Sequence, residues 1–333
     1  MPFSACLSGF KGAAITGLLI RIEGQSHWVL REDDDSVIRC VLRGKFKHDL
    51  RLKRGKLLNT DVAVVGDTVD FDLIDGGEGV IHAVHTRKNF ISRKAPKIKG
   101  ASARGERLEQ VIASNIDRLF IVGSFGSPPF NNRVVDRFLV IAESSDIQPV
   151  LVFNKTDLVE IPEELELWEE LYTGLGYQVF KVSATQGFGI KELRAEVMGK
   201  KSLFWGHSGV GKSSILNALF PGLELATGDV SLYSQRGKHT TVIVNMNRIN
   251  SNTFLVDTPG IREIAPFGIK KEDLAHYFVD LAGHLQGCKY KPCTHQHEPG
   301  CAVIEAVENE EISVDRYESY LRLLMNIEED MVY

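Results

Sequence analysis

The chain has 333 residues, a formal net charge of −5, 43% apolar residues and 25% charged residues. This composition is that of an ordinary globular protein, and the length favours two or three domains. No apolar run reaches membrane-spanning length, and residues 1–21 lack the basic head and long apolar stretch of a signal peptide. We therefore expect a cytoplasmic protein rather than a membrane or secreted one.

The N-terminal third is expected to form a β-barrel, because short apolar or β-branched stretches alternate there with turns rich in Gly, Asp and Asn. The expected strands are Ile15–Ile22, Ser26–Leu30, Val37–Leu42, Asp67–Leu73 and Gly79–His85. Five closely spaced strands favour a small closed barrel, with an OB-fold as the first candidate and an SH3-like barrel as the alternative. Residues 1–92 are assigned to this barrel.

Positive charge is concentrated in and just after the barrel, although the whole chain is acidic. Arg39–Lys56 and Arg87–Arg107 each hold eight Lys or Arg residues and one acidic residue. A charge run is usually a solvated face, but two dense runs in one third of the chain also suit an anionic partner such as RNA. Residues 93–108 are basic, contain Gly and have few large apolar side chains, so we expect a linker there.

Strands and helices alternate over residues 109–270, and this pattern predicts a largely parallel sheet covered by helices. The expected strands are Arg118–Gly123, Gln148–Phe153, Gln178–Val182, Lys201–Trp205, Thr240–Met246 and Thr253–Val256. The expected helices are Arg133–Ser144, Pro162–Gly174, Ile190–Met198 and Gly211–Leu219. Residues 271–333 are expected to form a helical C-terminal domain around a Cys/His-rich loop.

Asn154-Lys155-Thr156-Asp157 directly follows the apolar strand Val150–Phe153. This tetrad resembles the guanine-reading motif of the GTPase superfamily. The Asp157 carboxylate can accept two hydrogen bonds from the N–H and NH₂ edge of guanine, which adenine does not offer. Lys155 would cover the base with its alkyl stem, and Asn154 would tie the loop. After the next strand, Ser183-Ala184 resembles the last motif of the same superfamily, which gives a backbone N–H to the guanine oxygen.

A phosphate-binding loop follows. Its residues are Gly206-His207-Ser208-Gly209-Val210-Gly211-Lys212-Ser213, preceded by an apolar run and followed by a helical stretch from Ser214. The glycines allow the backbone N–H groups to point at phosphate, and the helix N-terminus adds partial positive charge. Lys212 is expected to reach the β- and γ-phosphates, and Ser213 is expected to bind Mg²⁺.

Asp257-Thr258-Pro259-Gly260 ends the strand after this loop, where Asp257 is placed to bind Mg²⁺ through water. Between the two motifs, residues 228–241 have the position of a first switch. Thr241 is the expected contact to Mg²⁺ and the γ-phosphate, with Thr240 as the alternative. Ile261 occupies the place of the glutamine that orients water in many GTPases, so His239 becomes the candidate, unless it serves only the structure of the switch.

The order of these motifs along the chain is rotated. Ordinary GTPases begin with the phosphate loop, whereas here Asn154 and Ser183 precede Gly206, and Asp257 comes last. Joining the old ends and cutting one exposed loop preserves the sheet, so we expect a circularly permuted GTPase core.

Near the C-terminus, Cys288-x4-Cys293-x-His295-x5-Cys301 supplies three thiols and one imidazole within 14 residues. Soft thiolates with one imidazole suit tetrahedral Zn²⁺, and four protein ligands leave no open position for catalysis. We expect a structural zinc site that folds a loop poor in apolar residues. His297 is the alternative to His295, and reduced cysteines without metal are the alternative to the site.

A basic barrel, a permuted GTPase core and a Cys/Cys/His/Cys site together resemble the RsgA (YjeQ) family, the small-ribosomal-subunit-dependent GTPases of bacteria. The resemblance covers nearly the whole chain and includes residues 237–241. It implies hydrolysis of GTP to GDP and phosphate, stimulated by the small subunit, late in subunit maturation. It also implies rRNA binding near the decoding region and release of assembly factors or of the protein itself. The implied cofactors are GTP or GDP, Mg²⁺ and one structural Zn²⁺, and we expect a monomer.

Two features depart from the family pattern. His207 stands where the family more often carries Gln or Pro, and the net charge is acidic. Two alternatives stay open: an RNA-binding scaffold in which nucleotide is only structural, and another RNA-directed GTPase unrelated to subunit assembly. Intact Lys212, Ser213, Asp257 and Asp157 oppose the scaffold.

Overall fold

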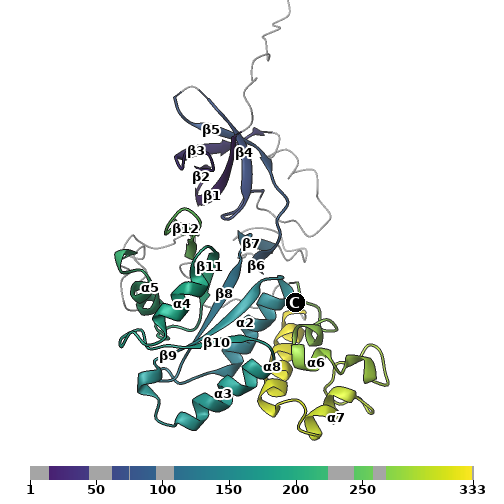
Figure 1. Ribbon diagram of the computed structural model, residues 1–333. Coiled ribbons are helices and arrows are strands. Elements are labelled where there is room, and N and C mark those ends of the chain that lie inside the picture. Colours follow the sequence, from purple (N-terminus) through teal and green to yellow (C-terminus); the bar gives the residue numbers. More distant parts are fainter. Residues whose placement is uncertain are drawn as a thin grey trace, which may run out of the picture.

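The computed structural model describes residues 15–44, 62–74, 76–94, 109–223, 244–257 and 268–331. The described residues form a barrel of strands, a central α/β region and a C-terminal helical region (Figure 1). The expected domain bounds at residues 92, 108 and 270 stay a prediction. None of the described helices is both long and apolar enough to cross a membrane.

The N-terminal barrel is closed and has five strands. They are β1 (Ile15–Glu23), β2 (Ser26–Arg31), β3 (Val37–Leu42), β4 (Thr68–Leu73) and β5 (Gly79–Val84). Neighbours follow the order β1-β2-β3-β5-β4, and β4 pairs back with β1; only the β3–β5 pair is parallel. Alternate apolar residues, among them Leu19, Val29 and Phe71, fill the interior. The barrel prediction is therefore confirmed, with the strand order of an OB-fold.

A hairpin-like pair of strands follows the barrel. β6 (Phe90–Lys94) pairs antiparallel with β7 (Glu109–Ser114). Arg93 and Lys94, which the sequence placed in the linker, thus belong to a strand, and residues 95–108 lie outside the described residues. The sequence did not predict this strand because basic residues make up its end. The strand is stabilised by its pairing with β7 and by the burial of Ile91.

The central sheet has the order β10-β9-β8-β11-β13-β12, with every neighbouring pair parallel except β12–β13. Its strands are β8 (Arg118–Ser124), β9 (Gln148–Asn154), β10 (Gln178–Lys181), β11 (Lys201–Trp205), β12 (Asn245–Arg248) and β13 (Phe254–Asp257). The helices are α2 (Asn132–Ser144), α3 (Pro162–Gly174), α4 (Ile190–Val197) and α5 (Lys212–Leu219). The predicted alternation is confirmed. The last two strands reach one or two residues beyond the expected ends, and residues 240–243 lie outside the described part of the chain.

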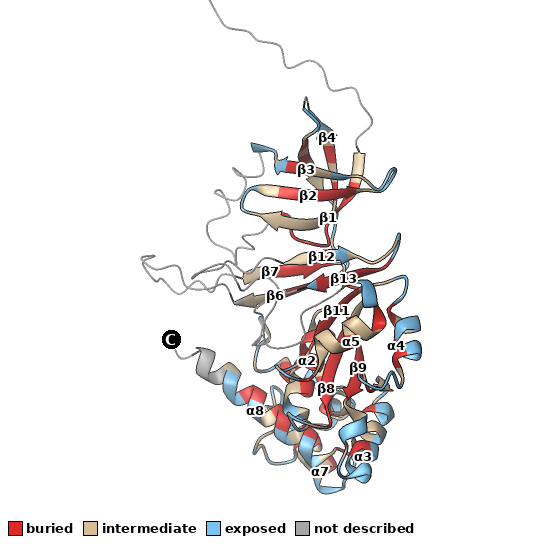
Figure 2. Cartoon of the chain, turned by 90° about the vertical axis from the view of Figure 1, so that its left-hand side faces the viewer, coloured by how far each residue is buried: buried red, intermediate tan, exposed pale blue. Residues whose placement is uncertain are grey.

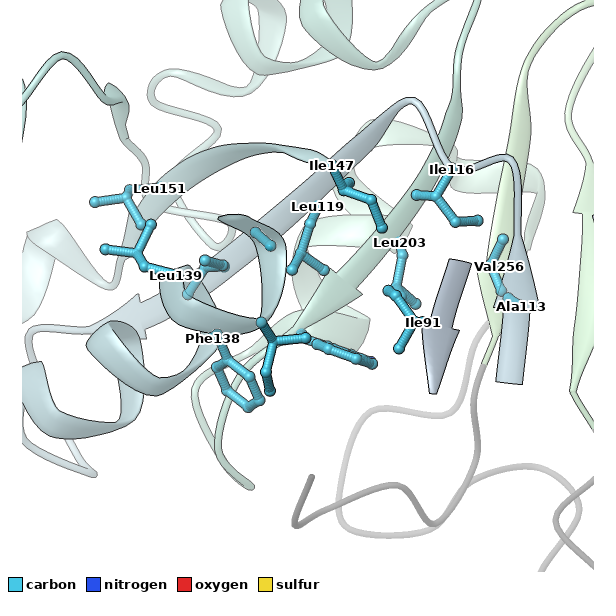
Figure 3. Packing of buried hydrophobic residues seen from close by; sticks show 14 of the residues in the cluster. Ile91, Ala113, Ile116, Leu119, Phe138, Leu139, Ile147, Leu151, Leu203 and Val256 are labelled. Carbon is cyan, nitrogen blue, oxygen red and sulfur yellow. The ribbon is translucent and has the colours of Figure 1, made fainter. Parts of the chain in front are cut away.

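Helices cover both faces of this sheet. Apolar residues of α2 and α3 pack in one cluster with the sheet, and those of α4 and α5 pack in a second cluster on the other face. On the α2 face, Ile91 and Ala113 of the hairpin-like pair lie beside Leu203 and Val256 of the sheet (Figure 3). The core therefore runs from the α/β region into the barrel, because Leu18, Leu30 and Val65 belong to the same cluster, and Figure 2 shows buried residues in both parts.

A buried carboxylate fixes the barrel to the hairpin-like pair. Asp67 is fully buried and accepts hydrogen bonds from Arg87 Nε at 2.8 Å, Ser114 Oγ at 2.6 Å and the Val64 backbone N–H at 2.8 Å. Gly66 has φ +98°, and a Cβ there would lie 2.0 Å from the Ser114 carbonyl oxygen. Only glycine fits this close approach.

The C-terminal region packs as helices against α2. Its elements are η3 (Leu274–Tyr277), α6 (Val279–Ala282), η4 (Leu285–Gly287), α7 (Ala302–Glu308) and α8 (Val314–Met331). Arg316 of α8 is 1% exposed; its Nη1 lies 2.6 Å from Asp136 Oδ1 of α2 and its Nη2 lies 2.9 Å from Asp280 Oδ1 of α6. Tyr172 of α3 also donates to Asp136 at 2.9 Å. A single buried guanidinium thus joins this region to the GTPase core.

Candidate functional site

The predicted nucleotide loops meet at one edge of the central sheet. β9 ends at Asn154, β11 at Trp205 and β13 at Asp257, and all of these strands run parallel. The carboxyl ends of parallel strands lie at the same edge, where ligands of open α/β sheets bind. The rotated order along the chain therefore leaves the motifs together in space.

The guanine motif is hydrogen-bonded to the phosphate loop. Asn154 Nδ2 donates to the Val210 carbonyl oxygen at 2.9 Å, and Lys155 Nζ donates to the Gly209 carbonyl oxygen at 2.7 Å and to that of Ser127. Gly211 has φ +96°, and a Cβ there would lie 2.3 Å from Asn154 Nδ2. The two loops consequently hold each other in one arrangement, with the glycine needed at their closest approach.

A second set of bonds orients the base-reading end. The Ala184 backbone N–H donates to Asn154 Oδ1 at 3.3 Å, and Thr156 Oγ1 donates to the Val182 carbonyl oxygen at 3.1 Å. Asp157 is exposed, and Thr185 Oγ1 donates to its Oδ2 at 3.4 Å. Thr185 and Ser127 were absent from the sequence prediction. Thr185 could have been proposed from the sequence, because its hydroxyl lies two residues after Ser183 of the last motif. Ser127 could not, because its contact with Lys155 uses only the backbone carbonyl oxygen.

The phosphate side of the site starts at the first turn of α5. Lys212 Nζ donates to the carbonyl oxygens of Gly206 and His207, both at 2.8 Å, so the amine lies over the loop. His207 is exposed and its Nδ1 lies 3.0 Å from the Ser208 carbonyl oxygen. The His207 ring therefore points away from the core, as a residue that contributes only its backbone would.

The predicted Mg²⁺ ligands are only partly within the described residues. Ser213 lies in the first turn of α5, and Asp257 ends β13 at the same sheet edge. Desolvation raises the pKa of the Asp257 carboxyl, and a divalent cation would offset this effect by favouring the ionised form. The donor chemistry therefore fits Mg²⁺. His239, Thr240, Thr241, Gly260 and Ile261 lie outside the described residues, and their roles stay predictions.

The four predicted zinc ligands form one cluster in the C-terminal region. The ligand atoms of Cys288, Cys293, His295 and Cys301 all lie within 4.8 Å of one another. His295 Nδ1 lies 3.5 Å from Cys288 Sγ and 3.3 Å from Cys301 Sγ. Tetrahedral zinc with bonds of about 2.0–2.3 Å separates its ligand atoms by about 3.5–3.8 Å. The cluster therefore fits a closed zinc site, and His297 lies outside it.

Burial shapes the protonation of this cluster. Desolvation lowers the pKa of His295, which favours the neutral imidazole that a metal requires. Desolvation, with the neighbouring sulfurs, raises the pKa of the Cys293 thiol to about 12. A cation at the centre would reverse this second effect by stabilising thiolate.

Side chains around the cluster hold its backbone. Tyr317 and Tyr320 of α8 donate to the carbonyl oxygens of His295 and Thr294 at 2.6 and 2.7 Å. Glu298 accepts from the backbone N–H groups of Thr294 at 2.7 Å and Gln296 at 3.0 Å. Desolvation, the largest single influence, raises the pKa of Glu298, but hydrogen bonds from Thr294 and from backbone N–H groups of the loop outweigh it and keep the pKa well below its usual range.

Together, the sheet order and the loops at its edge define a circularly permuted P-loop GTPase. Residues 84–266 match the RsgA GTPase family. A Bacteroides thetaiotaomicron protein called small ribosomal subunit biogenesis GTPase RsgA 2 is 38% identical over 315 residues, covering 94% of this chain and 97% of its own. The RsgA of Chlorobaculum parvum is 37% identical over 322 residues, covering 95% and 99%.

Two solved structures are similar over almost the whole chain. YjeQ from Thermotoga maritima has a TM-score of 0.73 at 33% identity, covering 95% of this chain and 99% of its own. YloQ, described as a circularly permuted GTPase, has a TM-score of 0.69 at 28% identity, covering 96% of each chain. The chain belongs to the RsgA GTPase family, and it is a GTP hydrolase that uses guanine nucleotide and Mg²⁺.

Proposed function

We propose that this GTPase acts in late maturation of the small ribosomal subunit. It would bind rRNA near the decoding region and use GTP turnover to time its own release or that of assembly factors. The observation that carries the proposal is the pairing of an OB-type barrel with the edge strand of the GTPase sheet, in a chain that is 38% identical to a relative named for small-subunit biogenesis.

Each loop at the sheet edge has a proposed role. Asp157 accepts hydrogen bonds from the guanine edge, and Lys155 and Asn154 hold its loop against the phosphate loop. Lys212 neutralises the β- and γ-phosphates, and Mg²⁺ would be held by Ser213, Thr241 and, through water, Asp257. Catalysis of phosphoryl transfer is mainly positioning and charge stabilisation, so this set supplies most of what the reaction needs.

The water-orienting group is proposed to be His239, brought into place when the small subunit binds. Ile261 cannot orient water, and completing such a site can raise the rate by about 10³–10⁵-fold. The C-terminal cluster is proposed to bind one structural Zn²⁺, because three sulfurs and one imidazole nitrogen lie within 4.8 Å of one another.

The test is GTP hydrolysis with and without purified small subunits, with large subunits as the control. We expect slow turnover by the protein alone and strong stimulation by small subunits only. His239→Ala should keep basal turnover and lose most of the stimulation, whereas full stimulation would assign the water-orienting group elsewhere. Equal turnover with and without small subunits would contradict the proposed function itself.

A further inference from the structure

A row of cross-strand neighbours runs from the GTPase site to the outer face of the barrel. Asp257 of β13 pairs with Asn245 of β12, and Asn245 pairs with Arg21 of β1. Arg21 pairs with Trp28 of β2, and Trp28 pairs with Arg39 of β3. Residues directly opposite each other in antiparallel strands place their side chains on the same face. These five side chains therefore share one face across the joined sheet.

This face is the one that carries the phosphate-loop helix. Leu255, two residues before Asp257, packs with Ile215 and Leu219 of α5. Because side chains two residues apart on a strand share a face, the row lies on the α5 side. In the barrel the row is on the outside, since the adjacent residues Val29 and Cys40 point into its core.

The barrel end of the row presents flat, partly exposed groups. The Arg21 guanidinium lies over the Trp28 ring, 4.9 Å from its centroid, within the range of a cation–π contact. The Arg21 side chain is 40% exposed, and the indole is partly exposed. On β3, Arg39 stands between the exposed side chains of Val37 and Val41. The surface thus offers an aromatic ring, a guanidinium plane and apolar flanks.

The two arginines have their charges neutralised by neighbouring carboxylates. Arg21 is paired with Glu23, and Arg39 Nη1 lies 3.0 Å from Glu78 Oε1. Arg39 also donates to Ser26 Oγ at 3.0 Å. A phosphate group would have to displace a carboxylate here, whereas a nucleobase could stack on the partly exposed Arg21–Trp28 pair without breaking either ion pair. Proteins bind unpaired nucleobases by stacking them on such aromatic and guanidinium planes.

We propose that Trp28 and Arg21 form a stacking site for an unpaired nucleobase. The ligand class is single-stranded RNA, because the bases of a duplex are stacked on each other and offer no free face. The inference rests on the proposed RNA partner and deepens it. The proposal assigns the RNA contact to Arg21 and Trp28, which lie in the same cross-strand row as Asp257. The sequence had pointed only to the two basic runs.

The experiment uses the full chain and a short single-stranded oligoadenylate, with an RNA duplex as the second probe. Trp28→Leu should weaken oligoadenylate binding by about 5- to 150-fold, the range for loss of one stacked base. Trp28→Tyr should restore most of the affinity. Duplex binding and basal GTP turnover should not change. Because Trp28 carries no charge, the ratio of the wild-type and Trp28→Leu affinities should stay constant as salt is raised.

Tyr290→Leu is the matched control, since Tyr290 is 48% exposed and also lies beside a cation, Lys289, at 5.4 Å. It should leave oligoadenylate binding unchanged. Equal affinities of Trp28→Leu and wild type, or an equal loss in Tyr290→Leu, would overturn the stacking site. Failure of small subunits to stimulate wild-type hydrolysis would instead overturn the proposed function, without changing the oligoadenylate result.

Discussion

The nucleotide loops and the zinc loop are both irregular segments, but they are held in different ways. The guanine and phosphate loops are tied by their own hydrogen bonds, Asn154 to Val210 and Lys155 to Gly209, and they start from buried strands. The loop from Cys288 to Cys301 contains few apolar residues, and its centre is a cluster of three sulfurs and an imidazole. The first loops are therefore built by the scaffold, while the second depends on what occupies its centre.

The largest expected effect separates the two kinds of loop. Cys293→Ser should remove about one equivalent of zinc and unfold residues 288–301, because structural zinc contributes about 10–16 kcal/mol of apparent binding free energy. Nucleotide affinity should remain close to that of the wild type. Metal analysis and hydrogen exchange measure these effects, with Cys40→Ala, a buried cysteine of the barrel, as the control that keeps its zinc. Unchanged zinc content in Cys293→Ser would show that the ligand set is wrong.

The next effect concerns the attachment of the zinc region to the core. Arg316→Met should lower the free energy of unfolding by about 3–5 kcal/mol, because it leaves Asp136 and Asp280 buried without their cation. Arg133→Met, which breaks the exposed pair with Glu318 on the same two helices, should cost at most about 1 kcal/mol. Chemical denaturation compares the two variants. A similar cost for both would mean that the buried pair does not hold the interface.

A smaller effect is expected in the scaffold-held loops. Asp157→Asn should weaken GTP binding by about 1.5–3 kcal/mol and favour xanthosine nucleotides, whose 2-oxo group accepts a hydrogen bond from the new amide. Because the loop ties do not involve this carboxylate, stability should stay unchanged. Calorimetric titration with both nucleotides provides the measurement, and equal GTP affinity in mutant and wild type would remove Asp157 from base reading.

The smallest expected effect is on GTP affinity and concerns Thr185, which contacts Asp157 in the same region. Thr185→Val should weaken GTP binding by about 0.5–1.5 kcal/mol, the usual net value of one hydrogen bond, because it removes the hydroxyl that orients Asp157. Thr185→Ser keeps that hydroxyl and should bind like the wild type. If Val and Ser at this position behave alike, the hydroxyl has no orienting role.

Much of the fold and the site was predictable because it rests on local signals. The barrel strands and the alternating core have clear periodicity, and the phosphate and guanine motifs have fixed spacing. The zinc cluster likewise follows from the spacing of its four ligands. In these parts, a few neighbouring residues are enough to indicate the secondary structure or the ligand.

The parts that escaped prediction depend on distant pairing. Arg93 and Lys94 of β6 look like linker residues until their partner strand, β7, is known. Arg316 lies in a polar helix and reads as a surface residue, yet it is buried against Asp136, 180 positions earlier in the chain. Asp67 similarly finds Ser114 across 47 positions. No local pattern encodes such contacts, because only the assembled domains create them.

The pairing of β1 with β12 has a consequence for the edge of the GTPase sheet. An edge strand with unpaired N–H and C=O groups is a template for association with other chains, and β12 is the edge of the six-stranded GTPase sheet. The barrel covers that edge with its own first strand. Removal of the barrel would therefore leave backbone N–H and C=O groups of β12 unpaired, so the N-terminal domain also closes the edge of the sheet that carries the nucleotide site.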